Sequence, residues 1–227
     1  MTFTLDKTTV PIVGGGEFPV RRIYCVGRNY RAHALEMGAD PDRDPPFFFM
    51  KPTDNIVHDG SVVPYPPRTA EYQHEIELVV AIGKEGRDVP VAQAADLIFG
   101  YAVGLDMTRR DLQMQARKAG RPWDMGKGFD HSAPCGAISP KSAVGEITQG
   151  AIWLKINGEI RQTSELSLLI WNVSEVIADL SMYMTLKPGD LIYTGTPENV
   201  SNVHPGDRLV GHVDGLVDLS ITVAAGA

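Results

Sequence analysis

Two glutamates and one aspartate stand in stretches that we expect to form neighbouring β-strands. Residues 74–82 and 100–106 are rich in β-branched and aromatic residues, as strands are. Alternate positions of a strand share a face, so Glu75 and Glu77 point the same way, and a strand ending in Asp106 could bring a third carboxylate to them. Three adjacent carboxylates need protons or a cation to offset their repulsion, and oxygen ligands suit Mg²⁺ first, then Mn²⁺ or Ca²⁺. The alternative is that both glutamates form the wet face of an amphipathic strand.

A second pair of side chains that could do chemistry lies on an expected helix. His33 and Glu36 are three residues apart, so they share a helix face and can touch. A carboxylate beside an imidazole favours the charged ring and orients it, as in a base that activates water. The alternative is a surface ion pair that contributes almost nothing to stability.

Three further side chains could bind an anion near the carboxylates. Asp106, Arg110 and Gln113 are spaced four and three residues apart, so they could line one wall, where a guanidinium can grip a carboxylate with two hydrogen bonds. Lys127 stands between two glycines, which let the backbone approach a ligand, and a partly buried lysine beside a metal could stabilise an oxyanion. Alternatively, Arg110 is an ordinary exposed helix charge and Lys127 a solvated loop residue.

The turn Thr194-Gly195-Thr196-Pro197 follows an apolar strand. Its backbone N–H groups and hydroxyls could donate hydrogen bonds to a ligand, or the segment could be a plain turn. The sequence has no glycine-rich phosphate loop, serine nucleophile elbow or cysteine zinc spacing, so covalent catalysis by serine or cysteine has no support.

Composition limits the classes of function. The chain has 227 residues, 43% hydrophobic and 22% charged, which is ordinary for a soluble globular protein, and no apolar run approaches the length of a membrane span. A net charge of −7 argues against a nucleic-acid partner. Residues 1–7 lack the pattern of a secretory signal, and the two cysteines, Cys25 and Cys135, form no disulfide framework, so we expect a cytoplasmic protein.

The rest of the pattern predicts a β-rich α+β fold in one domain, residues 1–227, with residues 1–20 as an irregular N-terminal arm. Beyond the two carboxylate segments we expect strands at 22–27, 47–50, 152–156, 159–161, 191–194 and 207–223. Helices are expected from an Asn29 cap to about Met37, at 92–98, from Thr108 to Gly120 with Asp111 in an approximate capping box, and at 172–185; loops are expected at 51–70 and 121–136. Asn157-Gly158 is the strongest hairpin signal in the chain.

Taken together, six ordered motifs resemble the fumarylacetoacetate hydrolase family over nearly the whole chain from Arg22 onward. The short chain resembles the acylpyruvate hydrolase branch of that family. The motifs are Gly27-Arg28-Asn29-Tyr30 with His33 and Glu36, Phe49-Met50-Lys51-Pro52, His74-Glu75-Ile76-Glu77, Asp106-Met107-Thr108 with Arg110, Asp111 and Gln113, Trp123 with Lys127 and Phe129, and Thr194-Gly195-Thr196-Pro197.

The resemblance implies a mixed β-roll of the family's C-terminal-domain type, in a homodimer. It also implies roles for individual residues: Mg²⁺ or Mn²⁺ held by Glu75, Glu77 and Asp106, water activation by His33 with Glu36, oxyanion support from Lys127, and substrate binding by Arg110, Gln113, Gly195 and Thr196. One departure affects the last turn. The family often continues it with Gly-Val-Gly, where this chain has Asn199-Val200-Ser201. Asparagine tolerates the left-handed backbone, whereas Ser201 could hinder the approach of this loop to substrate.

The activity that the resemblance implies is hydrolysis of a carbon–carbon bond in an anionic 2,4-diketo acid, with the metal as Lewis acid and template. We expect fumarylpyruvate, cleaved to fumarate and pyruvate in gentisate-type aromatic catabolism. Decarboxylation of oxaloacetate, or tautomerisation of a 2-oxo acid, would need the same stabilisation of an enolate. A non-catalytic binder of small dicarboxylates is a third alternative, against which the intact His33, Glu36 and Lys127 argue.

Overall fold

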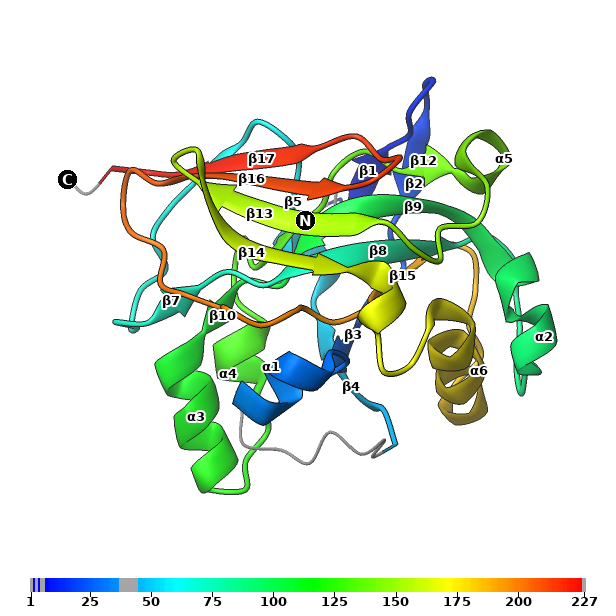
Figure 1. Ribbon diagram of the computed structural model, residues 1–227, viewed down its shortest axis with the longest axis horizontal. Helices are drawn as coiled ribbons and strands as arrows, with labels where there is room; N and C mark the ends of the chain where they lie inside the picture. Colours follow the sequence, from blue (N-terminus) through cyan, green and yellow to red (C-terminus); the bar gives the residue numbers. More distant parts are fainter. Residues whose placement is uncertain (1, 3, 5–6, 37–44, 226–227) are drawn as a thin grey trace.

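The computed structural model describes residues 2, 4, 7–36 and 45–225, and confirms the strand-rich α+β class (Figure 1). Two large sheets form the frame. The six-stranded sheet contains, in spatial order, β12 (Ser139–Pro140), β9 (Ile98–Leu105), β8 (Ile76–Ile82), β15 (Asp190–Tyr193), β3 (Arg22–Gly27) and β4 (Phe47–Lys51). The five-stranded sheet contains β14 (Glu159–Glu165), β13 (Ala151–Ile156), β16 (Arg208–Val213), β17 (Leu219–Val223) and β6 (Val62–Val63).

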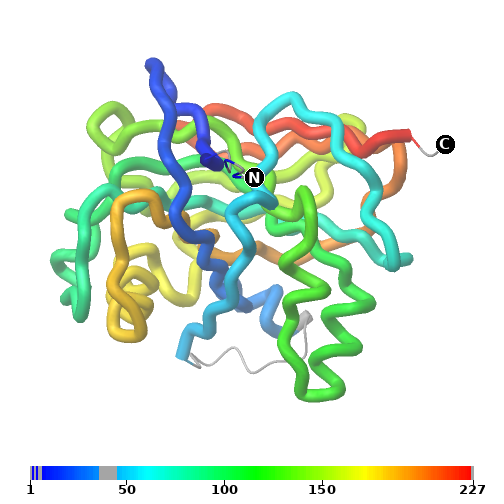
Figure 2. Tube along the Cα trace, turned by 180° about the vertical axis from the view of Figure 1, so that it is seen from behind, coloured from blue at the N-terminus to red at the C-terminus, as the bar shows by residue number. Residues whose placement is uncertain are grey.

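Three two-stranded ladders complete the strands. They pair β1 (Thr9–Pro11) with β2 (Glu17–Pro19), β7 (Tyr72–Gln73) with β10 (Thr108–Arg109), and β5 (Ile56–Val57) with β11 (Ala133–Pro134). The β3–β15, β6–β17 and β5–β11 pairs are parallel and the other pairs antiparallel, so the sheets are mixed. Figure 2 shows the N-terminal hairpin and the segment after β4 passing across the back of the molecule.

Strand β8 is buried on both faces, which explains its nearly continuous apolar sequence. Leu78 and Val80 belong to the main core between the large sheets, whereas Val79 and Ala81 belong to a second core with the N-terminal hairpin. The sheets pack tightly, because a Cβ on Gly211 of β16 would lie 2.5 Å from Cδ1 of Ile76. This double burial gives the carboxylate-bearing end of β8 a rigid support.

The helices are short and lie around the sheets. The α-helices are α1 (Arg31–Glu36), α2 (Val91–Ala94), α3 (Arg110–Lys118), α4 (Asp124–Lys127), α5 (Lys141–Val144) and α6 (Val173–Tyr183), and the 3₁₀ turns are η1 (Thr53–Asn55), η2 (Ala95–Leu97) and η3 (Leu166–Leu168). Figure 1 shows α1, α3 and α4 gathered at one side of the molecule, and α2 with α6 at the other. None of the helices in the described ranges is long and apolar enough to cross a membrane.

Two local predictions are confirmed in detail. Asn157 and Gly158 have φ values of 51° and 89°, the left-handed pair that a two-residue hairpin turn requires. Helix α6 begins after Asn172, whose side chain accepts a hydrogen bond from the backbone of Glu175 while Glu175 bonds back to the cap, a full capping box.

Several element boundaries were predicted wrongly. Residues 9–19 form the β1–β2 hairpin rather than an irregular arm. Thr108 does not begin a helix, because it pairs with Gln73 in a short ladder that delays α3 until Arg110. Asp111 forms no capping box; its carboxylate instead accepts hydrogen bonds from Thr69 Oγ1 and from the N–H of residue 70.

The first predicted helix and the expected loop at 121–136 also differ. Helix α1 is described from Arg31 to Glu36, and its predicted end near Met37 lies outside the described residues. Asn29 does not cap it, since its side-chain oxygen accepts from the N–H of Trp171, while its amide nitrogen donates to the backbone oxygens of Trp171 and Thr194. The 121–136 loop contains helix α4 and strand β11.

Candidate active site

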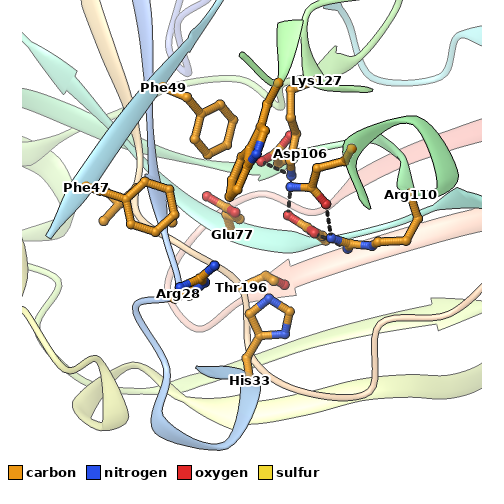
Figure 3. Close-up of a pocket in the computed structure, with 14 residues that line it drawn as sticks. Arg28, His33, Phe47, Phe49, Glu77, Asp106, Arg110, Lys127 and Thr196 are labelled. Carbon is orange, nitrogen blue, oxygen red and sulfur yellow. Dashed lines mark hydrogen bonds and ion pairs between the residues drawn. The ribbon is translucent and has the colours of Figure 1, made fainter. Parts of the chain in front are cut away.

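The structure brings Glu75, Glu77 and Asp106 together, as the strand pattern predicts. Strands β8 and β9 are antiparallel, and the backbone N–H of Asp106 donates to the carbonyl of Glu75 at 2.9 Å, so the two strand ends are directly opposite. All three side chains are buried, and one oxygen from each lies within 4.8 Å of the others. The wet-face alternative for Glu75 and Glu77 is therefore wrong. Figure 3 shows the pocket that they line.

Lys127 lies directly on this cluster and is itself buried, not a solvated loop residue. It comes from α4, and its Nζ is 2.7 Å from Oε2 of Glu75, 2.7 Å from Oδ2 of Asp106 and 2.7 Å from the hydroxyl of Thr108. These three acceptors match the three N–H donors of an ammonium. Although burial opposes the charged form, the carboxylates of Asp106 and Glu75 raise the pKa of Lys127, so the group is charged.

Lys51 is a second buried cation near the cluster. It belongs to the motif Phe49-Met50-Lys51-Pro52, but the sequence predicted no role for it. Its Nζ lies 2.9 Å from Oδ1 of Asp106 and donates to the carbonyl oxygens of Met107 and Lys127. Lys51 does not line the pocket, and it contacts Asp106 from outside the pocket lining. A lysine at the end of a mostly aromatic strand gives little sequence signal, because lysine is usually exposed.

Arg110 braces Glu75 in this structure. Its Nη2 donates to Oε1 of Glu75, its Nη1 to Oε1 of Gln113 and its Nε to Oε1 of Gln73 at 2.7 Å. Arg110 and Gln113 both line the pocket, so the predicted shared wall is present, and Arg110 is not an exposed helix charge. Since the oxygen of the Gln113 side chain accepts from Arg110, the other end of this side chain is its amide nitrogen, which only donates.

The two glutamates differ in electrostatic environment. Burial alone would raise the pKa of Glu75, but Lys127 and Arg110 hold it below its usual range. Burial, together with the charges of Asp106 and Glu75, raises the pKa of Glu77 well above its usual value. Oε2 of Glu77 accepts a hydrogen bond from the backbone N–H of Gly195 at 2.8 Å, and no basic side chain of the described residues pairs with it. Glu77 is thus the carboxylate of the cluster that lacks a cation.

The donor set fits a hard divalent cation. It consists of buried carboxylate oxygens, the ligand type preferred by Mg²⁺ and Mn²⁺. Oδ1 of Asp106 is buried and, in the described part of the chain, accepts no hydrogen bond of normal geometry even with Lys51 nearby. Glu77 has no basic partner among the described residues, so it and Oδ1 of Asp106 leave acceptor capacity that a cation would satisfy.

His33 faces the same pocket from α1. The side chain is 5% exposed, and Figure 3 shows the ring across the pocket from Lys127, near Thr196. The side chain of Glu36 lies outside the described residues, so the His33–Glu36 pair stays a prediction.

An aromatic wall that sequence reasoning did not assign to the site closes one side of the pocket. Phe47 and Phe49 pack against Trp123 with ring centroids 5.4 and 5.8 Å apart, and the guanidinium of Arg28 lies 5.4 Å from the Phe47 ring. The empty space in the pocket and at its open mouth amounts to about 340 Å³, solvent included. Its floor is therefore charged and its wall apolar, which suits a small anion with an unsaturated or aliphatic tail.

The turn after β15 forms the remaining side. Gly195 adopts φ 101°, and a Cβ there would lie 2.7 Å from Cβ of Asn29, so only glycine fits. Thr196 lines the pocket, and its hydroxyl accepts from Nε2 of Gln162 at 3.0 Å. Asn199 takes the left-handed backbone at φ 68°, as expected for this departure from the family pattern.

The side chain of Ser201 does not enter the pocket. Its hydroxyl lies 2.9 Å from Nε2 of His74, whose Nδ1 is 2.9 Å from Oε1 of Gln162. Burial lowers the pKa of His74 to about 4, so the ring is neutral at physiological pH. The loop carrying Ser201 is thus bonded to the residue that precedes Glu75.

Comparison with known proteins identifies the family. The model of the fumarylacetoacetate (FAA) hydrolase C-terminal family matches residues 22–224. This chain belongs to the fumarylacetoacetate hydrolase family. The predicted fold type, the C-terminal-domain fold of that family, is thereby confirmed.

Relatives in this family include hydrolases and tautomerases. A fumarylpyruvate hydrolase from Ralstonia sp is 54% identical over 177 residues, which cover 78% of this chain and 92% of the relative. A mitochondrial oxaloacetate tautomerase from Oryza sativa subsp. japonica is 42% identical over 205 residues, covering 89% of this chain and 90% of the relative. The crystal structure of a Pseudomonas aeruginosa fumarylpyruvate hydrolase with Mn²⁺ and pyruvate superimposes with a TM-score of 0.96 at 52% identity, covering 100% of both chains.

Proposed function

We propose that this protein is a metal-dependent acylpyruvate hydrolase, with fumarylpyruvate as its substrate and fumarate and pyruvate as products. The observation that carries the proposal is one pocket lined by three buried carboxylates, Lys127 and His33. The 54% identity to a fumarylpyruvate hydrolase supports the choice of acyl group. We assign the activity to the whole chain as a single catalytic domain.

In this proposal Glu75, Glu77 and Asp106 hold Mg²⁺ or Mn²⁺. The ion would supply Lewis-acid stabilisation of negative charge on the keto oxygen of the substrate. Pyruvate and Mn²⁺ are both present in the solved Pseudomonas aeruginosa relative, which supports a divalent metal and a pyruvate-type ligand.

His33 is the proposed general base. It would take a proton from water, whose oxygen adds to the distal carbonyl carbon of the diketo acid. The adjacent carbon–carbon bond then breaks, its electron pair passes to the pyruvate fragment as an enolate, and return of the proton from His33 to that carbon gives pyruvate. The acyl fragment leaves as the carboxylic acid. Glu36 would orient the ring of His33.

The other pocket groups bind and stabilise anionic substrate. The amide of Gln113 and the hydroxyl of Thr196 are donors at the pocket surface, and the Gly195 N–H holds Glu77 in place. Lys127 brings a fixed positive charge to the side opposite His33, where it would stabilise the developing enolate oxygen once it exchanges one of its protein acceptors. Arg110 would add charge at the same end of the pocket while it holds Glu75.

The tautomerase relatives favour a second candidate, enolisation or decarboxylation of oxaloacetate on the same site. Both reactions need a stabilised enolate but no attacking water. His33→Ala should therefore spare decarboxylation while it stops hydrolysis. Equal loss of both activities in this variant would show that His33 has another role.

The deciding experiment follows the near-ultraviolet absorbance of enolised fumarylpyruvate with Mg²⁺ or Mn²⁺ and after chelation, with oxaloacetate in parallel and pyruvate quantified in both. Metal-dependent loss with equimolar pyruvate supports the hydrolase. Absence of loss, with turnover of oxaloacetate alone, would replace the hydrolase by the second candidate.

We also propose that the protein is a cytoplasmic homodimer. Both cysteines are buried free thiols, which suits a reducing compartment. Light scattering on the purified protein tests the dimer, and a monomer at micromolar concentration would contradict it.

A further inference from the structure

Gln162 is a fully buried polar side chain on strand β14, outside the pocket. It belongs to none of the six sequence motifs and has no role in the proposed reaction. The orientation of its amide is determined by its partners. Nε2 lies 2.8 Å from the carbonyl of Pro197 and 3.2 Å from that of Glu198, which only accept, whereas Oε1 lies 3.1 Å from the N–H of Ile76, which only donates. The amide therefore cannot flip without breaking these hydrogen bonds.

This orientation decides what the hydroxyl of Thr196 can do. Nε2 of Gln162 is also 3.0 Å from Oγ1 of Thr196, so this hydroxyl accepts from the amide. A hydroxyl has one hydrogen, and among the described residues no protein group accepts the hydrogen of Thr196. Thr196 lines the same pocket as Glu77 and His33, and that hydrogen is therefore available to a ligand there.

Gln162 is held in turn by the strand that carries the carboxylates. Its Oε1 is 2.9 Å from Nδ1 of His74, and because an amide oxygen only accepts, Nδ1 must carry the hydrogen. His74 immediately precedes Glu75, and β8 pairs with β15, the strand that leads into the turn. One side chain thus connects the first carboxylate segment to the Thr196 turn through hydrogen bonds of fixed direction.

The fixed direction matters because the pocket holds three carboxylates and would receive an anion. A carboxylate of the substrate is attracted only by donors, and a rotating hydroxyl could instead donate to a carbonyl of its own loop. We infer that Gln162 is a positioning residue that keeps the Thr196 hydroxyl as a hydrogen-bond donor to a carboxylate group of the substrate. The inference rests on the proposed function, because it specifies how that site recognises an anionic ligand.

The test compares variants that remove each hydrogen bond with little change in shape. Gln162→Met removes both the donor and the acceptor, and Thr196→Val removes the hydroxyl. Each should raise KM for fumarylpyruvate roughly tenfold, as expected for a hydrogen bond to a charged group, and change kcat less than about twofold. The double variant should have a KM no higher than that of either single variant, because Gln162 acts through Thr196.

Thr196→Ser, which keeps the hydroxyl, should have the KM of the unmodified protein. Gln115→Met, on the exposed face of α3, is the matched control with unchanged kinetics.

Circular dichroism and thermal melting establish that each variant folds. If Gln162→Met does not fold, Gln162→Leu removes the same hydrogen bonds with a different side-chain shape, and the same rise in KM is expected. An unchanged KM in a folded Gln162 variant, or single effects that multiply in the double variant, would overturn the inference.

The outcome can be separated from failure of the proposed function. If the unmodified protein does not hydrolyse fumarylpyruvate, the proposed function fails, and the inference is then tested by calorimetric titration of the Mn²⁺-loaded protein with pyruvate. A roughly tenfold weaker Kd in Gln162→Met and in Thr196→Val supports it. Equal pyruvate affinity in these variants and in the unmodified protein would overturn it.

Discussion

The ammonium of Lys51 lies 2.9 Å from Oδ1 of Asp106, whereas Lys127 contacts Oδ2 of the same carboxylate. Asp106 is therefore bound by one cation at each oxygen, and all three side chains are buried. An unpaired charge in such a place is costly, so each member of this arrangement depends on the others.

Lys51→Met should consequently destabilise the protein although the side chains are similar in size. It leaves the carboxylate of Asp106 with one cation fewer, and it removes a donor from the carbonyls of Met107 and Lys127, of which the second keeps the hydroxyl of Ser132. We expect a loss of roughly 3–5 kcal/mol in the free energy of unfolding, measured by urea denaturation. Lys84→Met, at an exposed position, should change it by less than about 0.5 kcal/mol. A stability equal to that of the unmodified protein would show that Lys51 does not support Asp106.

Glu77→Gln should weaken metal binding specifically. The substitution keeps the shape and an oxygen that can accept from Gly195, but removes a carboxylate that can ionise to bind a cation and that has no basic partner among the described residues. Changing a group next to a metal ligand often costs 10–100-fold in affinity, so changing a ligand should weaken Mn²⁺ binding at least about tenfold. Titration followed by the electron paramagnetic resonance of free Mn²⁺ measures this. Glu159→Gln, on an exposed side chain, is the control, and equal affinities in all three proteins would remove Glu77 from the metal site.

Gly126→Ala should misplace Lys127. A Cβ on Gly126 would lie 2.8 Å from both the backbone nitrogen and Cβ of Gln113, so α4 must move away from α3. A displacement of the order of 1 Å can cost roughly 10–100-fold in kcat/KM, which steady-state kinetics would detect. At Gly128 the nearest atom, Cδ of Pro52, would be 3.2 Å away, and Gly128→Ala should lose less activity. The reverse order of the two variants would contradict this packing argument.

The glycines beside Lys127 illustrate how sequence reasoning can find a residue for an incomplete reason. The prediction was that they let the backbone approach a ligand. The structure shows that Gly126 instead lets two helices approach each other, and that Lys127 is helical and buried. The carboxylate cluster was predictable because alternation along a strand and pairing of neighbouring strands are enough to bring Glu75 and Glu77 to Asp106.

Gln162 was not predictable in the same way, because its inward direction depends on a bulge. In the β13–β14 hairpin, Lys155 pairs with Ile160 but Leu154 pairs with Gln162, so Arg161 is the extra residue. A regular hairpin would have placed Arg161 opposite Leu154 and turned Gln162 outward. The role of Lys51 escaped detection for a different reason, since its partners are 55 or more positions away and come together only in the folded sheet.

His212 provides a pH-dependent prediction far from the pocket. Its Nδ1 lies 2.6 Å from Asp218 and its Nε2 3.1 Å from Asp214, while its ring stacks on Trp153 with centroids 4.6 Å apart. Partial burial opposes the charged form, but the two carboxylates outweigh it and raise the pKa of His212 above 6.5. A group with a raised folded-state pKa contributes stability that is complete below its unfolded pKa and disappears as pH rises through the folded value.

The unmodified protein should therefore have a higher thermal midpoint than His212→Gln. This difference should be larger at a pH about one unit below 6.5 than at a pH about two units above 6.5. Loss of stacking on Trp153 lowers the midpoint of the variant at both pH values, so the pH-dependent part of the difference reports the charge alone. His204→Gln, at an exposed position, is the control and should show no such dependence. A difference that is constant across the range would mean that His212 has the same pKa in the folded and unfolded protein, and that the two carboxylates do not stabilise a charged imidazolium.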